Sequence, residues 1–244
     1  GKIIEKEKIN LLPTSPTFLN LMLMDDIKNK FNLSSLKMIS YGTELMPASL
    51  LLKLRKKFPK VRFLQTFGTS ETGIIQTQSD SSESLKIKLK DPHQQFRIVN
   101  GELWLKSKTQ ILGYLNAKMD SFTKDGWFRT GDLVKEYKDG YIKIEGRAKE
   151  VINVGGEKVL PSEIESLLFE IPEILDCVAY GEKNSITGQA VAADIVLKKK
   201  VELKVMKKKI REFCIGKVSN YKIPAKIKII RKTDFSDRFK KIRN

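Results

Sequence analysis

The chain has 244 residues, of which 41% are hydrophobic, enough for one large domain or for two ordinary domains with separate cores. It has two cysteines, Cys177 and Cys214, and one histidine, which excludes a disulfide framework and a cysteine–histidine zinc site and favours a reducing cytoplasm. No apolar run approaches the ~20 residues that span a bilayer, and the charged opening residues exclude a signal peptide. We therefore expect a cytoplasmic protein without a membrane span.

The charge balance is strongly basic, with 46 Lys and Arg against 29 Asp and Glu and a formal net charge of +17. Such an excess is typical of proteins that bind nucleic acid or another anionic surface. The lysines, however, are spread over helix-like and strand-like segments and lack the aromatic interleaving of a single-strand groove. We expect a solvated lysine-rich surface, with nucleic-acid binding as a minor alternative.

The first 90 residues alternate between strand-like and helix-like segments. Short apolar strands are predicted in INLLPTSP, LKMISYGTEL and VRFLQTFGTSETG, and helices in the stretches that follow Pro16 and Pro47. This alternation predicts an α/β fold with a parallel sheet, and it places the loops 41–44 and 66–73 at the carboxyl ends of strands, where ligands bind. The first strand starts with no preceding helix or cap, which is typical of the middle of a larger sheet domain.

The pattern of predicted elements changes twice in the remaining chain. Residues 91–148 contain short strands with glycine turns, including a hairpin turn at Asp139-Gly140, and predict a small barrel-like or antiparallel subdomain. Residues 149–244 predict a compact α+β domain with a strand-like VINVGGEKV, a helix from Pro161 and a basic helix over 202–217. The expected boundary lies near Lys149.

Three motifs stand in a fixed order along the chain, and they are QTFGTSETG, FRTGDL and GRAKEVINVGGEKVLPSEIE. Together they resemble the adenylate-forming superfamily, which includes acyl-CoA synthetases and the adenylation domains of peptide synthetases. The resemblance implies that residues 1–148 are the C-terminal part of the large AMP-binding domain and that residues 149–244 are the small mobile domain.

The upstream motif supplies the candidate nucleotide and metal ligands. By resemblance, Tyr41, Gly42, Thr43 and Glu44 lie beside the adenine and the acyl pocket, and Phe67 of the Phe67-Gly68 turn stacks on the base. The hydroxyl of Ser70 can hydrogen-bond a phosphate oxygen, and the carboxylate of Glu71 can hold Mg²⁺. Taken alone, this segment is also compatible with an ordinary polar turn.

By the same resemblance, the downstream motifs supply the ribose, hinge and thiol-side residues of the superfamily. The carboxylate of Asp132 can accept hydrogen bonds from both ribose hydroxyls, and the guanidinium of Arg147 suits the ribose and phosphate region. Lys149 occupies the hinge about which the small domain turns. Gly155 and Gly156 fall where a loop approaches the acyl-adenylate and the pantetheine thiol, with a plain β-turn as the competing interpretation.

The segment SDRFKKIRN resembles a motif of the same superfamily that carries its catalytic lysine. In that alignment Lys240 is the catalytic lysine, and Lys241 replaces it if the register slips by one. Its positive charge would stabilise the transition state as the acyl-adenylate forms. A basic tail without a catalytic role is the alternative, because Phe239 stands where the motif has glycine.

The Ser/Thr/Gly-rich phosphate loop of the superfamily is absent from this sequence. The chain could be an excised domain, a natural truncation or one half of a split enzyme whose other half comes from a separate chain. The implied activity is ATP- and Mg²⁺-dependent activation of a small carboxylic acid as its adenylate, followed by transfer to coenzyme A or to the pantetheine of an acyl carrier protein. The alternative is a catalytically silent module that binds a nucleotide or a partner.

Overall fold

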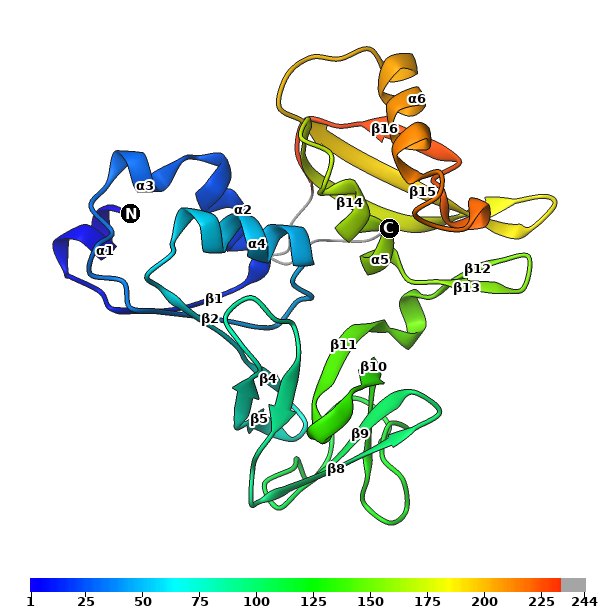
Figure 1. Ribbon diagram of the computed structural model, residues 1–244. Helices are drawn as coiled ribbons and strands as arrows, with labels where there is room; N and C mark the ends of the chain where they lie inside the picture. The colour runs from blue at the N-terminus through cyan, green and yellow to red at the C-terminus, as the bar shows by residue number, and fades with distance from the viewer. Residues whose placement is uncertain (234–244) are drawn as a thin grey trace.

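A computed structural model describes residues 1–233 of the chain. Figure 1 shows three lobes in chain order, and each has its own hydrophobic core. The three cores draw on residues 4–63, 75–142 and 152–227 respectively. The predicted architecture of an α/β part, a curled β-rich part and an α+β part is confirmed. No helix among the described residues is long and apolar enough to cross a membrane.

The first lobe is a three-stranded parallel sheet with strand order β1-β2-β3. Its strands are β1 (Leu11–Thr14), β2 (Met38–Tyr41) and β3 (Arg62–Gln65), and its helices are α1 (Lys2–Lys6), α2 (Pro16–Met24), α3 (Ile27–Lys30) and α4 (Ala48–Lys57). The prediction that no helix precedes the first strand is wrong. Helix α1 lies before β1 and buries Ile4 in the core of this lobe. Five residues are too few for a clear helical period, so the sequence pattern did not reveal it.

Helix α2 follows the local rules for helix ends. Ser15 is its N-cap and accepts a hydrogen bond from Phe18 N at 3.2 Å, while Pro16 occupies the first turn, where its missing N–H costs nothing. The helix ends at Asp25, and Asp26 takes a left-handed conformation with φ of 49° before α3 begins. The carboxyl ends of β1 and β2 and the amino ends of α2 and α4 consequently lie at one edge of the sheet.

The second lobe is built from hairpins. A short hairpin, β4 (Phe67–Thr69) and β5 (Gly73–Ile75), leads into a six-stranded sheet with the order β6-β7-β11-β10-β9-β8. Its strands are β6 (Thr77–Ser79), β7 (Ile87–Leu89), β8 (Gln94–Val99), β9 (Glu102–Ser107), β10 (Phe128–Glu136) and β11 (Ile142–Arg147). The predicted turn at Asp139-Gly140 is confirmed, since φ is 62° and 73° at these residues within the short helix η1 (Lys138–Gly140).

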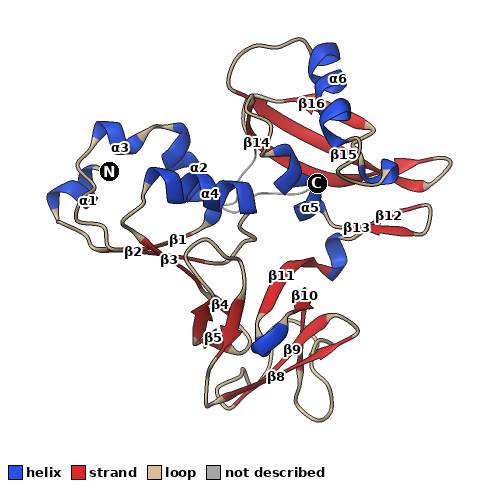
Figure 2. Cartoon of the chain, in the orientation of Figure 1, coloured by secondary structure: helices blue, strands red, loops and turns tan. Residues whose placement is uncertain are grey.

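The third lobe is a five-stranded sheet covered by two helices (Figure 2). After the turn η2 (Ala148–Glu150) come β12 (Ile152–Val154), β13 (Glu157–Val159), α5 (Pro161–Leu168), β14 (Ile174–Asn184), β15 (Gly188–Leu197), α6 (Leu203–Cys214), η3 (Asn220–Lys222) and β16 (Lys226–Ile229). Helix α6 buries Met206, Ile210 and Cys214, which recur every four residues and therefore share one face. Both cysteines are buried, and neither is in a disulfide.

Three side chains of the first lobe hold the third lobe by donating hydrogen bonds to its backbone carbonyls. Lys53 Nζ donates to Phe169 O at 2.7 Å, Ser49 Oγ to Ser166 O at 3.3 Å, and Asn20 Nδ2 to Leu175 O at 3.2 Å. The carbonyls of Ser166 and Phe169 belong to the last turn of α5 and its cap, so Lys53 also satisfies the negative end of that helix.

Candidate functional site

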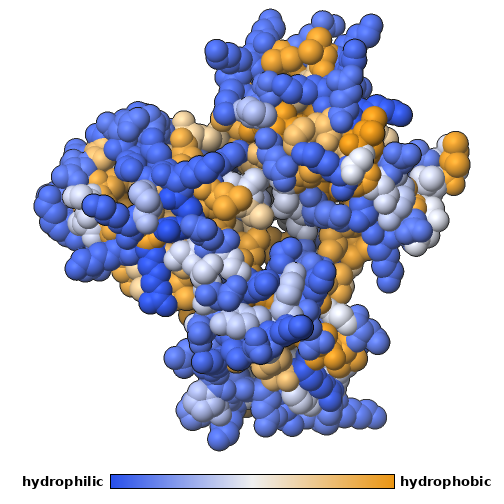
Figure 3. All heavy atoms as spheres, viewed as in Figure 1, coloured by the Kyte–Doolittle hydropathy of each residue, from blue (hydrophilic) through white to orange (hydrophobic). Residues whose placement is uncertain are grey.

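A cavity of about 760 Å³ lies where the three lobes meet, beside the carboxyl ends of the parallel strands. In Figure 3 the hollow at the centre of the molecule separates the surfaces of the lobes. Its wall combines the start of α2, the loops after β2 and β3, the middle of β10, the end of β11, the η2 turn and helix α5. The lining residues used below are Thr17, Thr43, Glu44, Gln65, Phe67, Gly68, Ser70, Asp132, Arg147, Lys149, Glu150, Glu165 and Phe169.

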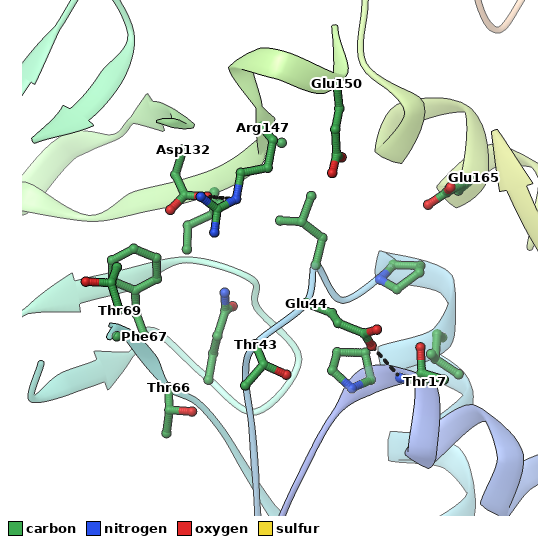
Figure 4. Close-up of a pocket in the computed structure, with 18 of the residues that line it drawn as sticks. Thr17, Thr43, Glu44, Thr66, Phe67, Thr69, Asp132, Arg147, Glu150 and Glu165 are labelled. Carbon is green, nitrogen blue, oxygen red and sulfur yellow. Dashed lines mark hydrogen bonds and ion pairs between the residues drawn. The ribbon is translucent and has the colours of Figure 1, made fainter. Parts of the chain in front are cut away.

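Asp132 and Arg147 form an ion pair in this wall. They face each other across the antiparallel β10–β11 ladder, and Arg147 Nε donates to Asp132 Oδ1 at 2.9 Å (Figure 4). Thr130 supports both partners, because its hydroxyl accepts from Asp132 N at 3.0 Å and its carbonyl accepts from Arg147 Nη1 at 2.7 Å. The pair is therefore held in place without a ligand.

The second carboxylate oxygen of Asp132 has no hydrogen-bond partner within residues 1–233. Asp132 is only 5% exposed, and its Oδ2 is buried without a hydrogen bond among the described residues. Burial raises the pKa of Asp132 to about 6, although the Arg147 charge opposes that shift. A buried oxygen left without a donor is costly, and a ligand that brings hydroxyl donors into the cavity would satisfy it.

Gln65, which sequence reasoning missed, provides a second acceptor of this kind. It is 6% exposed, it lines the cavity at the end of β3, and its Oε1 is also buried without a hydrogen-bond partner in the described part of the chain. Its backbone is fixed on both sides, with Gln65 N donating to Ser79 Oγ at 3.1 Å and Gln65 O accepting from Thr77 Oγ1 at 2.7 Å. A glutamine at the end of a strand carries no sequence signal that would have singled it out.

The loop after β2 contributes Thr43 and Glu44 to the wall, whereas Tyr41 and Gly42 are not among the lining residues. Tyr41 is 2% exposed in the core of the first lobe, where burial raises its pKa. A Cβ on Gly42 would lie 2.5 Å from Thr66 Oγ1, so glycine is needed for the close approach of the two loops. Thr43 has φ of 68°, which is unusual for a β-branched residue and marks local strain at the cavity.

Glu44 carries a negative charge to the amino end of α2. Its Oε2 accepts a hydrogen bond from Thr17 N at 3.1 Å, as the dashed line in Figure 4 shows. This geometry places an anion at a helix N-terminus, where the free N–H groups favour it. The α2 end of the cavity therefore already holds one carboxylate.

The β4–β5 hairpin holds Phe67 and Gly68 of β4 and Ser70 of the turn at the cavity. Thr69 Oγ1 accepts from Thr72 N at 3.0 Å and locks the turn, while the hydroxyl of exposed Ser70 makes no hydrogen bond within residues 1–233. A Cβ on Gly68 would come within 2.8 Å of Ile74 Cα, so this glycine is required by the hairpin itself. Ser70 remains available to a ligand.

Glu71 points its carboxylate toward Tyr114, and it is not among the lining residues. Tyr114 Oη donates to Glu71 Oε1 at 2.9 Å, and burial together with this bond raises the pKa of Tyr114 to about 12. The other oxygen, Oε2, has no partner in the described part of the chain. Tyr114 is far from Glu71 in the sequence, which is why sequence reasoning did not find this contact.

The two glycines predicted on the thiol side lie elsewhere. Gly155 and Gly156 form the exposed turn of the β12–β13 hairpin, with φ of 61° and 95°, and neither lines the cavity. Lys149 and Glu150 of η2 do line it, and so does Glu165 of α5, whose Oε1 accepts from Ala179 N at 3.0 Å. Lys240 and Lys241 lie outside the described residues.

Two family profiles match the chain. One, described as AMP-binding enzyme, matches residues 2–115, and the other, described as AMP-binding enzyme C-terminal domain, matches residues 163–237. The chain belongs to the AMP-binding enzyme family.

Curated relatives and solved structures agree with this assignment. The chain is 30% identical to an indoleacetate–CoA ligase of Aromatoleum aromaticum, covering 92% of the chain and 46% of the relative, and 30% identical to a mitochondrial medium-chain acyl-CoA ligase of Danio rerio, covering 91% and 40%. Its fold matches an anthranilate–CoA ligase in complex with anthranoyl-AMP with a TM-score of 0.83 and 22% identity, over 98% of this chain and 49% of that one. The chain thus spans about half the length of the curated relatives that it matches.

Proposed function

We propose that this chain is the nucleotide-contacting and C-terminal portion of an AMP-forming acid–thiol ligase. The observation that carries the proposal is the buried, partnerless Oδ2 of Asp132, held in a cavity beside a fixed guanidinium. An ionised carboxylate in this position can accept hydrogen bonds from the two hydroxyls of a ribose. Its partner Arg147 is half exposed, which leaves the guanidinium able to contact the ribose or a phosphate oxygen.

The rest of the wall suits an adenine nucleotide. The ring of half-buried Phe67 can stack on a purine base, and the partnerless Oε1 of Gln65 can accept from an exocyclic amine. The hydroxyl of Ser70 can donate to a phosphate oxygen. In this proposal the backbone geometry of the two loops depends on Tyr41, Gly42 and Gly68. The acyl side is bordered by Thr43 and Glu44.

Glu71 fits a magnesium ion that is held mainly by substrate phosphates. Within residues 1–233 no group of three or more His, Cys, Asp or Glu side chains gathers as a metal site. Mg²⁺ typically takes one or two protein carboxylates and completes its shell with phosphate and water, and the free Oε2 of Glu71 meets that requirement. When bound, the ion would neutralise phosphate charge, while Tyr114 keeps the carboxylate in place.

The proposed reaction has two steps. A carboxylate oxygen attacks the α-phosphorus of ATP and pyrophosphate leaves, and the thiolate of coenzyme A or of carrier-protein pantetheine then attacks the acyl carbon and AMP leaves. Lys240, or Lys241 if the register slips, would stabilise charge in the first step. In the second step rotation about Lys149 would bring Gly155 and Gly156, which here lie outside the cavity wall, toward the acyl-adenylate.

We propose a small carboxylic acid as substrate and the cytoplasm as the compartment, the latter because neither cysteine is in a disulfide. The relatives contain a further half that this chain does not match. We propose that a corresponding segment, from the same polypeptide or from a separate chain, completes the phosphate site. The alternative is a catalytically silent module that keeps the nucleotide site.

The first test is calorimetric binding of AMP and of a non-hydrolysable acyl-adenylate analogue to this chain and to Asp132→Ala. Specific binding that the substitution removes is expected, and equal binding by both proteins would overturn the proposal. A fusion of the chain to the upstream half of the Aromatoleum ligase then reports carboxylate-dependent exchange of pyrophosphate into ATP. Exchange supports the ligase, whereas tight binding without exchange over a broad panel of acids supports the silent module.

A further inference from the structure

The described part of the chain ends on a buried polar contact. Thr233 is 2% exposed, and its hydroxyl donates a hydrogen bond to Asp176 Oδ2 at 2.6 Å. Asp176 is 3% exposed, and its other oxygen, Oδ1, accepts from the backbone N–H of Cys177 at 3.0 Å. Both oxygens of this buried carboxylate are therefore bonded, one of them to a side chain 57 positions further along the chain.

A β-bulge sets the direction of the Asp176 side chain. The register between β14 and β15 shifts between Ile174 and Asp176, which makes Leu175 the extra residue of the bulge. In a regular strand Ile174 and Asp176 would share one face. Here Ile174, Cys177 and Ala179 all belong to the core of the third lobe, so Asp176 points to the opposite face of the sheet.

The same bulge connects this face of the third lobe to the cavity. The carbonyl of Leu175 accepts a hydrogen bond from Asn20 Nδ2 at 3.2 Å, and Asn20 is a buried residue of α2 that lines the cavity. Asp176 follows Leu175 directly in the chain. The position of Thr233 is consequently tied to the cavity wall through two hydrogen bonds and one peptide link.

The path of the chain after β16 shows what the contact holds. Residues 192–195 of β15 pair with β14 on one side and with β16 on the other, so β15 lies between them (Figure 1). Ile230 N still donates to Ile195 O at 2.9 Å. Residues 231–233 therefore cross β15 to reach β14, and the bond from Thr233 to Asp176 fastens the end of this crossing.

Lys240 lies seven positions after Thr233 in the sequence. Seven residues reach at most about 23 Å, whereas the eleven residues from Ile229, the end of β16, reach at most about 36 Å. A shorter tether raises the effective concentration of the group that it carries. We propose that Asp176 and Thr233 are positioning residues that fix, beside the cavity, the start of the segment carrying the candidate catalytic lysine. This inference rests on the proposed function, in which that lysine stabilises charge in the first step.

Hydrogen–deuterium exchange on this chain tests the anchor itself. Thr233→Val keeps the shape of the side chain and removes the O–H donor, so amides over residues 230–233 should exchange at least fivefold faster. Thr233→Ser keeps the donor and should exchange at the wild-type rate. Thr123→Val is the matched control, because it removes a hydroxyl that accepts from Trp127 N in the second lobe, and it should leave residues 230–233 unchanged. Unchanged exchange in Thr233→Val would overturn the proposal.

The fusion with the upstream half of the Aromatoleum ligase tests positioning separately from folding. Thr233→Val should lower kcat for exchange of pyrophosphate into ATP at least threefold, with KM for ATP within twofold of wild type. Transfer from a synthetic acyl-adenylate to coenzyme A should stay within twofold, because the lysine is proposed to act in the first step. Thr233→Ser should restore exchange. An equal loss in both steps would show that the contact only supports the fold, and the proposal would be wrong.

A double substitution tests whether the two residues act through one contact. Asp176→Asn should also slow exchange, and Asp176→Asn with Thr233→Val should be no more than twofold slower than the slower single variant. Losses that multiply would contradict a shared role. A wild-type fusion without exchange would overturn the proposed function and this inference with it, whereas wild-type exchange in Thr233→Val would overturn this inference alone.

Discussion

Two antiparallel strand pairs flank Lys149, and they differ in how far their side chains are already positioned at the cavity. The β10–β11 pair carries a buried carboxylate, a guanidinium and a threonine that are bonded to one another at the cavity. The β12–β13 pair, a few residues further on, carries two exposed glycines in a turn outside the cavity wall. In the proposed mechanism the ribose side of the site is thus assembled in advance, whereas the thiol side would form only after the third lobe moves.

The largest expected effect comes from removing the Asp132 carboxylate. Asp132→Ala should weaken binding of an acyl-adenylate analogue by about 100-fold, or ~3 kcal/mol, because it removes charge-assisted hydrogen bonds to two hydroxyls. Calorimetry on the purified chain measures the change. Asp132→Asn keeps the shape and should lose less, and Asp120→Asn, on an exposed residue outside the cavity wall, should lose nothing.

The raised pKa of Asp132 predicts opposite pH dependences for binding and for folding. Burial raises this pKa to about 6, so the folded protein takes up the proton before the unfolded chain does. As pH rises from about 4 to about 6, wild type should lose up to about 3 kcal/mol of unfolding free energy relative to Asp132→Asn, while nucleotide affinity rises as the carboxylate ionises. Denaturant unfolding and calorimetry across this pH range measure the two trends.

A second substitution separates the causes of this shift. Arg147 lowers the pKa of Asp132 against the effect of burial, so Arg147→Ala should move both pH midpoints above 6. An unchanged midpoint would mean that the ion pair does not control the protonation of this carboxylate.

The glycine hairpin should respond in the opposite manner. Gly156 has φ of 95°, where a β-branched residue is strained, so Gly156→Val should cost about 1–2 kcal/mol of stability. Analogue binding should stay within about twofold of wild type, because the hairpin does not line the cavity. A large loss of binding would show that the hairpin already reaches the nucleotide in solution and would remove the contrast between the two strand pairs.

Sequence reasoning recovered the elements whose signals are local and missed the contacts that the fold creates. Strand-and-turn patterns predicted the parallel sheet, the Asp139-Gly140 turn and the helix from Pro161, and the motifs placed Asp132 and Arg147 at one site. At Gly146 of the third motif φ is not positive, and a Cβ there would lie 2.7 Å from Leu160 Cδ2. The close approach of Leu160 and the orphaned Gln65 oxygen arise only when distant segments pack together, so no local pattern carries them.

The smallest expected effect is that of substituting Tyr114, and it tests whether the ordered side of the site extends to Glu71. The hydroxyl of Tyr114 donates to Glu71, and its ring packs edge-on against Phe122, which in turn contacts Phe128 at the start of β10. Tyr114→Phe keeps the ring and removes one hydrogen bond, so it should cost about 1 kcal/mol or less in denaturant unfolding. Tyr114→Leu also removes the ring contact and should cost more.

In the fusion, Tyr114→Phe should reduce the gain in ATP affinity on adding Mg²⁺ while AMP affinity without metal stays constant. The reason is that the Glu71 carboxylate, once it loses its donor, no longer holds Oε2 in one position. If both affinities changed together, Tyr114 would support the fold of the loop and have no specific effect on Glu71.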